Sequence, residues 1–158
     1  MNTNLILVLA FAIGIVAGLR SLTAPAAVSW AARLGWLNLE GSPLAFMGST
    51  VALVGFSLLA IGEYVADLHP STPSRTTPGP LIARIVMGGL SGACLCAGSN
   101  HSLVAGAALG GIGGLVGAFA GYEIRTRLVR ALGVKDRVVA VAEDLVAIVL
   151  AWCIVASR

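Results

Sequence analysis

An arginine directly behind an uninterrupted apolar run constrains this chain more than any other feature. Residues 5–19 carry no charge, Arg20 follows them without a break, and apolar sequence resumes after Pro25. A guanidinium in the hydrocarbon layer costs roughly 2.5–3.5 kcal/mol on insertion scales, so it needs carboxylates, carbonyl groups or a water-filled cavity around it. Proline removes a helical hydrogen bond and kinks or breaks a helix. The sequence therefore predicts a broken membrane helix with a polar site beside the break.

The composition is typical of polytopic membrane proteins. Of the 158 residues, 58% are hydrophobic and 11% are charged, whereas a soluble domain has about 25% charged residues. We expect one transmembrane domain over residues 1–158. The net charge of +3 does not indicate nucleic-acid binding, because the basic residues lie in short loops between apolar runs, where they set the topology. We expect no cofactor.

Long apolar runs predict an all-α transmembrane bundle. A spanning helix needs about 20 mostly apolar residues, and we expect about five such segments. The first is long enough to cross the membrane, break near Pro25 and continue along the interface. Residues 125–137 are basic and amphipathic, which predicts a segment at the headgroup level, and Asp136 is placed to cap the helix that follows. The predicted segments cover residues 5–32, 44–66, 81–97, 102–122 and 138–156.

Loop arginines indicate an orientation, because cytoplasmic loops carry an excess of Arg and Lys. With five segments, most of the loop arginines share a side with the N-terminus. This predicts a cytoplasmic N-terminus and an external C-terminus. If the first stretch is instead a complete hairpin, the count becomes six and we expect both termini in the cytoplasm.

The fourth predicted helix carries glycines at helical spacing. Small residues four positions apart let helix backbones approach closely in lipid, as in a glycine zipper. Two ridges of glycine lie on different faces of this helix, so they suit contacts within the chain, between subunits, or both. We expect helix packing here and a homo-oligomer. The ridges consist of Gly106, Gly110 and Gly114, and of Gly113, Gly117 and Gly121.

Acidic residues near or within the apolar runs are the candidates for a site. Glu63 and Asp67 lie four residues apart and share a helix face, while Glu143 and Asp144 lie about two turns inside the last helix. Adjacent helical residues are about 100° apart, so at least one of the second pair should face the protein interior. We expect Arg20 to pair with at least one of these four acids. The candidate substrate- or ion-binding residues are Arg20, Glu63, Asp67, Arg75, Glu143 and Asp144.

Three interpretations of these residues stay open. The charges form structural ion pairs, or they line a polar cavity for an ion, a solute or an anionic headgroup. The third is a divalent-metal site, because oxygen ligands suit magnesium or manganese; no metal-enzyme motif accompanies it, and we assign no metal. Its ligands would be Glu63, Asp67, His69 and Asp144. Glu123 and Arg127 have the spacing of an ordinary helical ion pair.

Three motifs carry a family resemblance. They are GLRSLTAP at residues 18–25, GEYVAD at 62–67 with PSRTTP at 73–78, and AED at 142–144. Together they resemble a family of small bacterial integral-membrane proteins, the domain-of-unknown-function family 4126. The resemblance covers most of the chain and implies a multi-pass bundle in the bacterial inner membrane. It implies no established activity, but it directs attention to the same six charged residues.

The function that these features favour is a small inner-membrane transporter or channel-like protein with a charged intramembrane cavity. The alternative is a non-transporting scaffold or lipid-binding protein whose buried charges are structural, and an enzyme acting on lipid headgroups is third. We do not expect an enzyme, because the chain has no GxSxG or HExxH motif and no nucleophilic Cys/His arrangement. The expected partners are membrane lipid, a second copy of the chain, and a small ion, solute or anionic headgroup.

Overall fold

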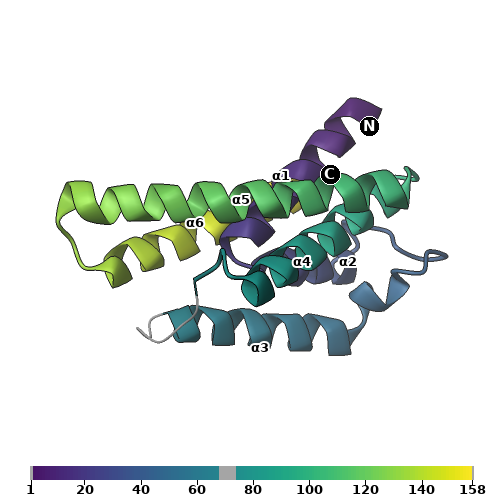
Figure 1. Cartoon of the computed structure of the whole chain (residues 1–158). Coiled ribbons are helices and arrows are strands. Elements are labelled where there is room, and N and C mark those ends of the chain that lie inside the picture. Colours follow the sequence, from purple (N-terminus) through teal and green to yellow (C-terminus); the bar gives the residue numbers. More distant parts are fainter. Residues whose placement is uncertain (1, 68–73, 158) are drawn as a thin grey trace.

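The computed structural model describes residues 2–67 and 74–157, and all regular structure within these residues is helical (Figure 1). Four helices are long and apolar enough to cross a membrane by length and composition, and α1 is a shorter apolar helix. The chain is therefore a multi-pass protein of the membrane type, while the predicted count of five segments stays a prediction. The helices are α1 (Thr3–Leu19), α2 (Thr23–Arg33), α3 (Thr50–Asp67), α4 (Pro78–Ala97), α5 (Leu103–Leu132) and α6 (Asp136–Ala156), and the 3-10 helix η1 (Ala45–Gly48) precedes α3.

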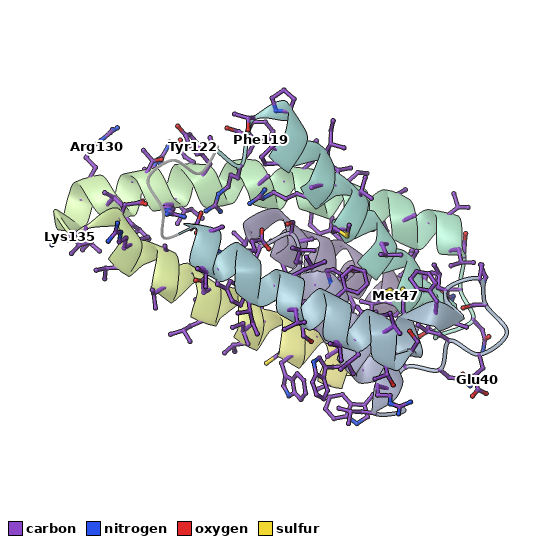
Figure 2. All side chains as sticks on the ribbon, turned by 90° about the horizontal axis from the view of Figure 1, so that it is seen from below. Glu40, Met47, Phe119, Tyr122, Arg130 and Lys135 are labelled. Carbon is purple, nitrogen blue, oxygen red and sulfur yellow. The ribbon has the colours of Figure 1, made fainter. Side chains whose placement is uncertain are left out.

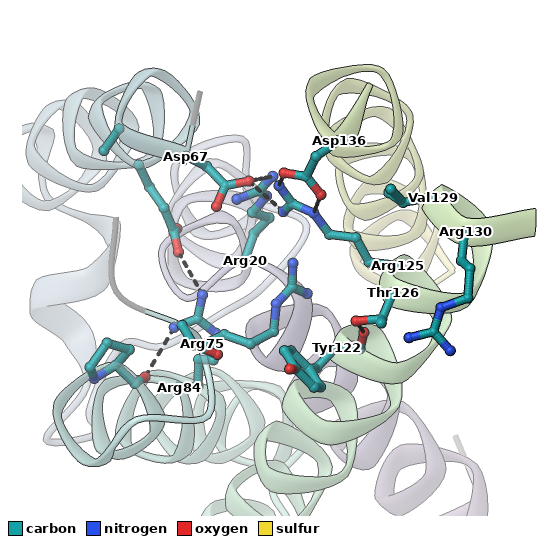
Figure 3. Close-up of a pocket in the computed structure, with 14 residues that line it drawn as sticks. Arg20, Asp67, Arg75, Arg84, Tyr122, Arg125, Thr126, Val129, Arg130 and Asp136 are labelled. Carbon is teal, nitrogen blue, oxygen red and sulfur yellow. Dashed lines mark hydrogen bonds and ion pairs between the residues drawn. The ribbon is translucent and has the colours of Figure 1, made fainter. Parts of the chain in front are cut away.

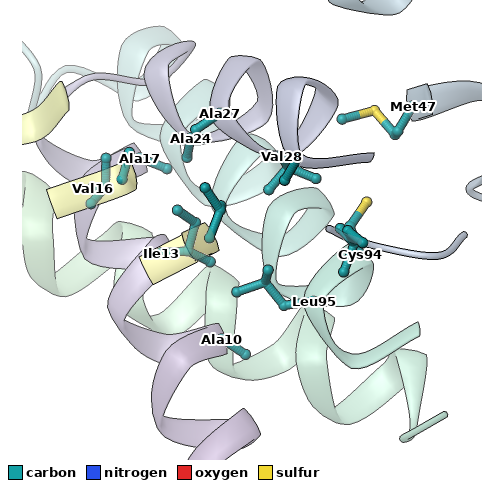
Figure 4. Packing of buried hydrophobic residues seen from close by; sticks show 14 of the residues in the cluster. Ala10, Ile13, Val16, Ala17, Ala24, Ala27, Val28, Met47, Cys94 and Leu95 are labelled. Carbon is teal, nitrogen blue, oxygen red and sulfur yellow. The ribbon is translucent and has the colours of Figure 1, made fainter. Parts of the chain in front are cut away.

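The outer surface of the bundle is apolar, and side chains project outward from every helix (Figure 2). Val51, Leu58 and Val104 are 83%, 63% and 77% exposed. Such large exposed apolar areas are unfavourable in water but match a hydrocarbon solvent. The interior is built mainly from small or branched side chains, such as Ala10 and Ala24 (Figure 4).

The helices α1 and α2 form a hairpin. Gly14 of α1 lies against Gly110 of α5, and Gly18 lies against Gly114 further along, so α1 runs parallel to α5. In α2, the hydroxyl of Thr23 hydrogen-bonds that of Tyr64, whereas the indole of Trp30 donates to Ser57. Residue numbers increase along α2 while those of the contacting residues in α3 decrease, so α2 runs antiparallel to α3. It returns toward the end of the bundle where α1 begins.

This reversal bears on the predicted orientation. The start of α1 and the end of α6 lie away from the end of the bundle where α5 finishes (Figure 1). The N-terminus and the basic segment 125–137 therefore lie toward opposite ends of the bundle, whereas the five-segment arrangement placed them on one side. The side of the membrane on which each terminus lies stays a prediction.

The break itself lies at residues 20–22, ahead of Pro25. The chain leaves the helix at Arg20, which has extended backbone angles (φ −139°, ψ 110°). Pro25 occupies the first turn of α2, where its missing N–H has no partner to lose within the helix. Eight of the eleven residues of α2 are buried, and α2 contacts α3, α4 and α6. The sequence predicted a segment along the membrane interface, whereas α2 packs into the bundle.

The helix α5 extends further than predicted. It continues through residues 125–132 without interruption and ends at Gly133, which has a positive φ of 62°, a conformation that glycine adopts readily at a helix C-terminus. Its 30 residues measure about 45 Å at 1.5 Å per residue, against a hydrocarbon layer of about 30 Å. The basic part of α5 is therefore a helical extension of a segment that is long and apolar enough to cross the membrane. Lys135 is the N-cap residue of α6, and the Asp136 carboxylate binds Arg125 instead of capping the helix.

Both glycine ridges face neighbours within the chain. A Cβ built on Gly110 would lie 2.2 Å from the carbonyl oxygen of Gly88 in α4, and one on Gly113 would lie 2.2 Å from that of Phe11 in α1. Gly106 and Gly114 also face α4, Gly117 also faces α1, and Gly121 lies beside Leu19, Arg75 and Glu143. Because both ridges are used inside one chain, they do not support an oligomer, and the homo-oligomer stays a prediction.

Candidate functional site

Polar side chains gather around a cavity at the end of the bundle where α5 finishes. The cavity has a volume of about 590 Å³ and lies between α3, the turn at residues 74–77, α4, α5 and the start of α6. Figure 3 shows these side chains converging from different helices. Five arginines and three carboxylates line it: Arg20, Arg75, Arg84, Arg125 and Arg130, with Glu63, Asp67 and Asp136.

Arg20 lies at the α1–α2 break and is 1% exposed. Its Nη2 donates to Oδ2 of Asp67 over 2.8 Å, and its Nε forms an ion pair with Asp144. The buried guanidinium is thus balanced by one acid from α3 and one from α6. The pairing that its depth in an apolar sequence predicted is present, with two partners.

Arg125 connects three helices. Its Nη1 donates to Asp67 over 2.6 Å, while its Nε and Nη2 donate to the two carboxylate oxygens of Asp136 over 2.9 and 2.6 Å. Such bidentate pairs are stronger than single contacts and hold a fixed geometry. Arg125 therefore ties the end of α3 to the start of α6.

Arg75 holds the turn at residues 74–77 against α6. Its two terminal nitrogens bind the two carboxylate oxygens of Glu143, and the Nη2–Oε2 distance is 2.8 Å. The arginine is 7% exposed, so this pair lies in a region of weak solvent screening. Glu143 and Asp144 both face the protein, one toward Arg75 and the other toward Arg20.

The two helix ends created by the break are matched by opposite charges. At the start of α2, the Glu63 carboxylate accepts hydrogen bonds from the backbone N–H groups of Ser21 and Leu22 over 2.8 and 2.9 Å. At the end of α1, the Nε of Arg84 donates to the carbonyl oxygen of Gly18 over 3.1 Å. Anions stabilise helix N-termini and cations stabilise C-termini, where backbone groups lack helical partners.

All six candidate residues from the sequence belong to this network, but not all of them meet the cavity. Glu143 and Asp144 lie behind the arginines that form the wall. Arg84 and Arg125 were not among the candidates from the sequence, and the structure places both on the wall. For Arg84 a signal was present, because it lies inside the apolar run of α4 just as Arg20 lies in that of α1.

The carboxylates named as possible metal ligands form ion pairs with arginines. Among the described residues, no group of three or more His, Cys, Asp or Glu side chains is arranged to hold a metal ion. His69 lies outside the described residues, and Asp67 and Asp144 both bind Arg20. Away from the cavity, the exposed Glu123 and Arg127 form the expected helical pair over 2.7 Å.

A comparison with known proteins gives one match. The model of the family described as "Domain of unknown function (DUF4126)" matches residues 7–157. No match is found among the curated proteins or among the solved structures. The matched range includes the helix break, the cavity wall and every ion pair described above.

Proposed function

The chain belongs to the DUF4126 family, and we propose that it is a small transport protein that binds a charged solute in the cavity at the charged end of the bundle. The observation that carries this proposal is the α1–α2 break at the cavity wall. Arg20 stands at the break, and Glu63 and Arg84, which stabilise the two helix ends, also line the cavity. Interrupted helices whose ends meet charged groups are a common construction of solute sites in membrane transporters.

The size of the cavity supports the proposal. About 590 Å³ lies within the range of roughly 300–1,000 Å³ that is typical of small-molecule sites. Its wall consists largely of charged groups that already bind one another across helices. A solute that replaces one of these partners changes the connection between two helices, which couples binding to movement.

The element that we propose to move is α3. Ala60 is its buried residue, and the rest of the helix is exposed or half-buried. Its firmest polar attachments are the contacts of Glu63 with the start of α2 and those of Asp67 with Arg20 and Arg125. Because these attachments line the cavity, a charged solute would compete with them directly.

We place the protein in the bacterial inner membrane with the cavity open to the cytoplasm. The cavity end carries Arg130, Lys135 and Arg137 at or beside the α5–α6 connection, as expected for a cytoplasmic face. Toward the other end, Trp36 and Trp152 pack edge to face with ring centroids 5.2 Å apart, and tryptophan is enriched at membrane interfaces. With the hairpin, this orientation puts both termini outside.

The second candidate is a non-transporting scaffold or lipid-binding protein. It is favoured by the degree of internal pairing, because Glu63, Asp67, Glu143 and Asp144 each bind an arginine in the structure. A buried network of this kind is sufficient to hold helices in register without any solute. The two candidates differ in whether the cavity exchanges material across the membrane.

Solute flux in proteoliposomes separates them. The purified chain is reconstituted, and currents on solid-supported membranes are recorded for sodium, potassium, chloride, acetate and phosphate gradients. We expect current with at least one solute, abolished in the charge-balanced variant Arg20→Gln/Asp144→Asn and kept in Arg127→Gln, which lies away from the cavity. Absence of current with every solute, from protein shown to be folded, refutes transport and leaves the scaffold.

A further inference from the structure

We propose that the cavity binds a phosphate-type group, either as a free phosphate or phosphomonoester or as the phosphate of a lipid headgroup. The inference deepens the proposed function and rests on the same cavity. It follows from the arginine nitrogens on the wall that the internal ion pairs leave available.

The wall that a solute meets is rich in arginine. Five arginines and three carboxylates line it, and Asp144 and Glu143 pair from behind the wall with Arg20 and Arg75. Because these two acids balance the remaining charge, the preference for an anion comes from guanidinium nitrogens that lack an acceptor. Such nitrogens can only donate hydrogen bonds, which suits the oxygens of a phosphate and not a cation.

Arg130 is the clearest free cation on the wall. Within the described part of the chain its side chain has no ion pair or hydrogen bond, yet it lines the cavity on the α5 side (Figure 3). Arg127, three residues earlier on the same helix, is paired with Glu123 and does not line the cavity. Arg130 therefore offers an unpaired guanidinium to a ligand in the cavity, and Arg127 does not.

Arg84 contributes a second donor. Two of its nitrogens bind the carbonyl oxygens of Gly18 and Pro80, each over 3.1 Å. The third, Nη2, lies 3.7 Å from Oε1 of Glu63, which is beyond hydrogen-bonding distance. The Glu63 oxygens already accept the backbone N–H groups of residues 21 and 22. An oxyanion would give this nitrogen the acceptor that Glu63 does not supply.

Hydroxyl groups complete the wall. Tyr122 and Thr126 lie on α5 two turns and one turn before Arg130 and line the cavity with it (Figure 3). The Thr126 hydroxyl donates to the carbonyl oxygen of Tyr122 over 2.8 Å, so the hydroxyl that can serve as a donor is that of Tyr122. The planar fork of guanidinium N–H groups matches the oxygens of a phosphate, and a hydroxyl group is a further donor to such oxygens. Guanidinium nitrogens of Arg84 and Arg130 with the hydroxyl of Tyr122 form a set suited to a tetrahedral oxyanion.

Binding is measured on the full chain in detergent free of phospholipid, by isothermal titration calorimetry with inorganic phosphate and, separately, with short-chain phosphatidic acid. Potassium chloride and acetate at equal ionic strength serve as comparison ions. We expect saturable binding of at least one phosphate probe. Arg130→Gln should weaken it about tenfold to a hundredfold, the usual range for a lost hydrogen bond to a charged group. Arg127→Gln, the matched control, should bind as wild type does.

The two probes identify the source of the phosphate. Binding of inorganic phosphate indicates a soluble substrate, and binding of phosphatidic acid alone indicates a lipid headgroup. The inference is overturned if neither probe saturates, if chloride or acetate binds equally well, or if Arg130→Gln and Arg127→Gln behave alike. Phosphate binding without current would refute transport and support the phosphate site. Current with another solute, without phosphate binding, would support transport and refute the phosphate site.

Discussion

One methyl group at Gly110 tests how closely α4 and α5 approach. A Cβ at this position would lie 2.2 Å from the carbonyl oxygen of Gly88 and 3.1 Å from Cα of Gly92. Both neighbours are backbone, so no side chain can rotate away. Ordinary contact begins at 3.4 Å, and Gly110→Ala therefore requires the two helices to separate by about 1 Å where they cross.

The expected cost follows from two opposing effects. Overpacking of a well-packed interior costs about 1–3 kcal/mol, while alanine in place of glycine returns up to about 1 kcal/mol of helix propensity. A net loss of about 1–2 kcal/mol lowers the unfolding midpoint by about 2–8 °C, on the scale of soluble domains of this size. The measurement is thermal unfolding in detergent, followed by tryptophan fluorescence.

Gly55→Ala is the matched control for this prediction. Gly55 also lies inside a helix, α3, but a Cβ there meets nothing within 4 Å. Its unfolding midpoint should stay the same or rise slightly. If Gly110→Ala and Gly55→Ala melt at the same temperature, α4 and α5 are not in backbone contact at Gly110, and the packing described here is wrong.

Two further predictions concern the charges and the topology. Arg20→Gln leaves the half-buried Asp144 without its arginine and should lower stability by up to about 3–5 kcal/mol, the range for a fully buried pair. Adding Asp144→Asn should restore much of the loss; a double variant no more stable than the single one would contradict the pairing. In a background without the native cysteines, a cysteine replacing Asn4 should react with a membrane-impermeant thiol reagent added to intact cells, and one replacing Lys135 should not; the opposite pattern would reverse the orientation.

Several properties of this protein are determined by its sequence alone. Long apolar runs require helices, because backbone groups in lipid must be satisfied within the segment. The burial of Arg20 beside carboxylates follows from the same physics, since an unpaired charge in an apolar segment is costly. Glycines at positions 106, 110 and 114 predict a close helix contact because helical spacing alone places them on one face.

The tertiary structure determined which helices these features contact. Helical periodicity states which residues share a face but not which neighbour that face meets, so the partners of the glycine ridges, α4 and α1, were not predictable. Arg125, in the extension of α5 through residues 125–132, binds Asp67 of α3 and Asp136 of α6. These are contacts between distant segments, and no local pattern encodes them.

The direction of the chain after Arg20 shows the difference most clearly. An arginine followed by a proline predicts an interruption, but a kinked helix and a hairpin have the same local sequence. The choice depends on whether α2 can pack against α3, α4 and α6. It also depends on Glu63 of α3 and Arg84 of α4, which bind the backbone groups left without helical partners at the two helix ends. Local backbone chemistry thus specified that the helix stops, whereas packing and charge pairing between distant helices specified that the chain turns back and surrounds a cavity.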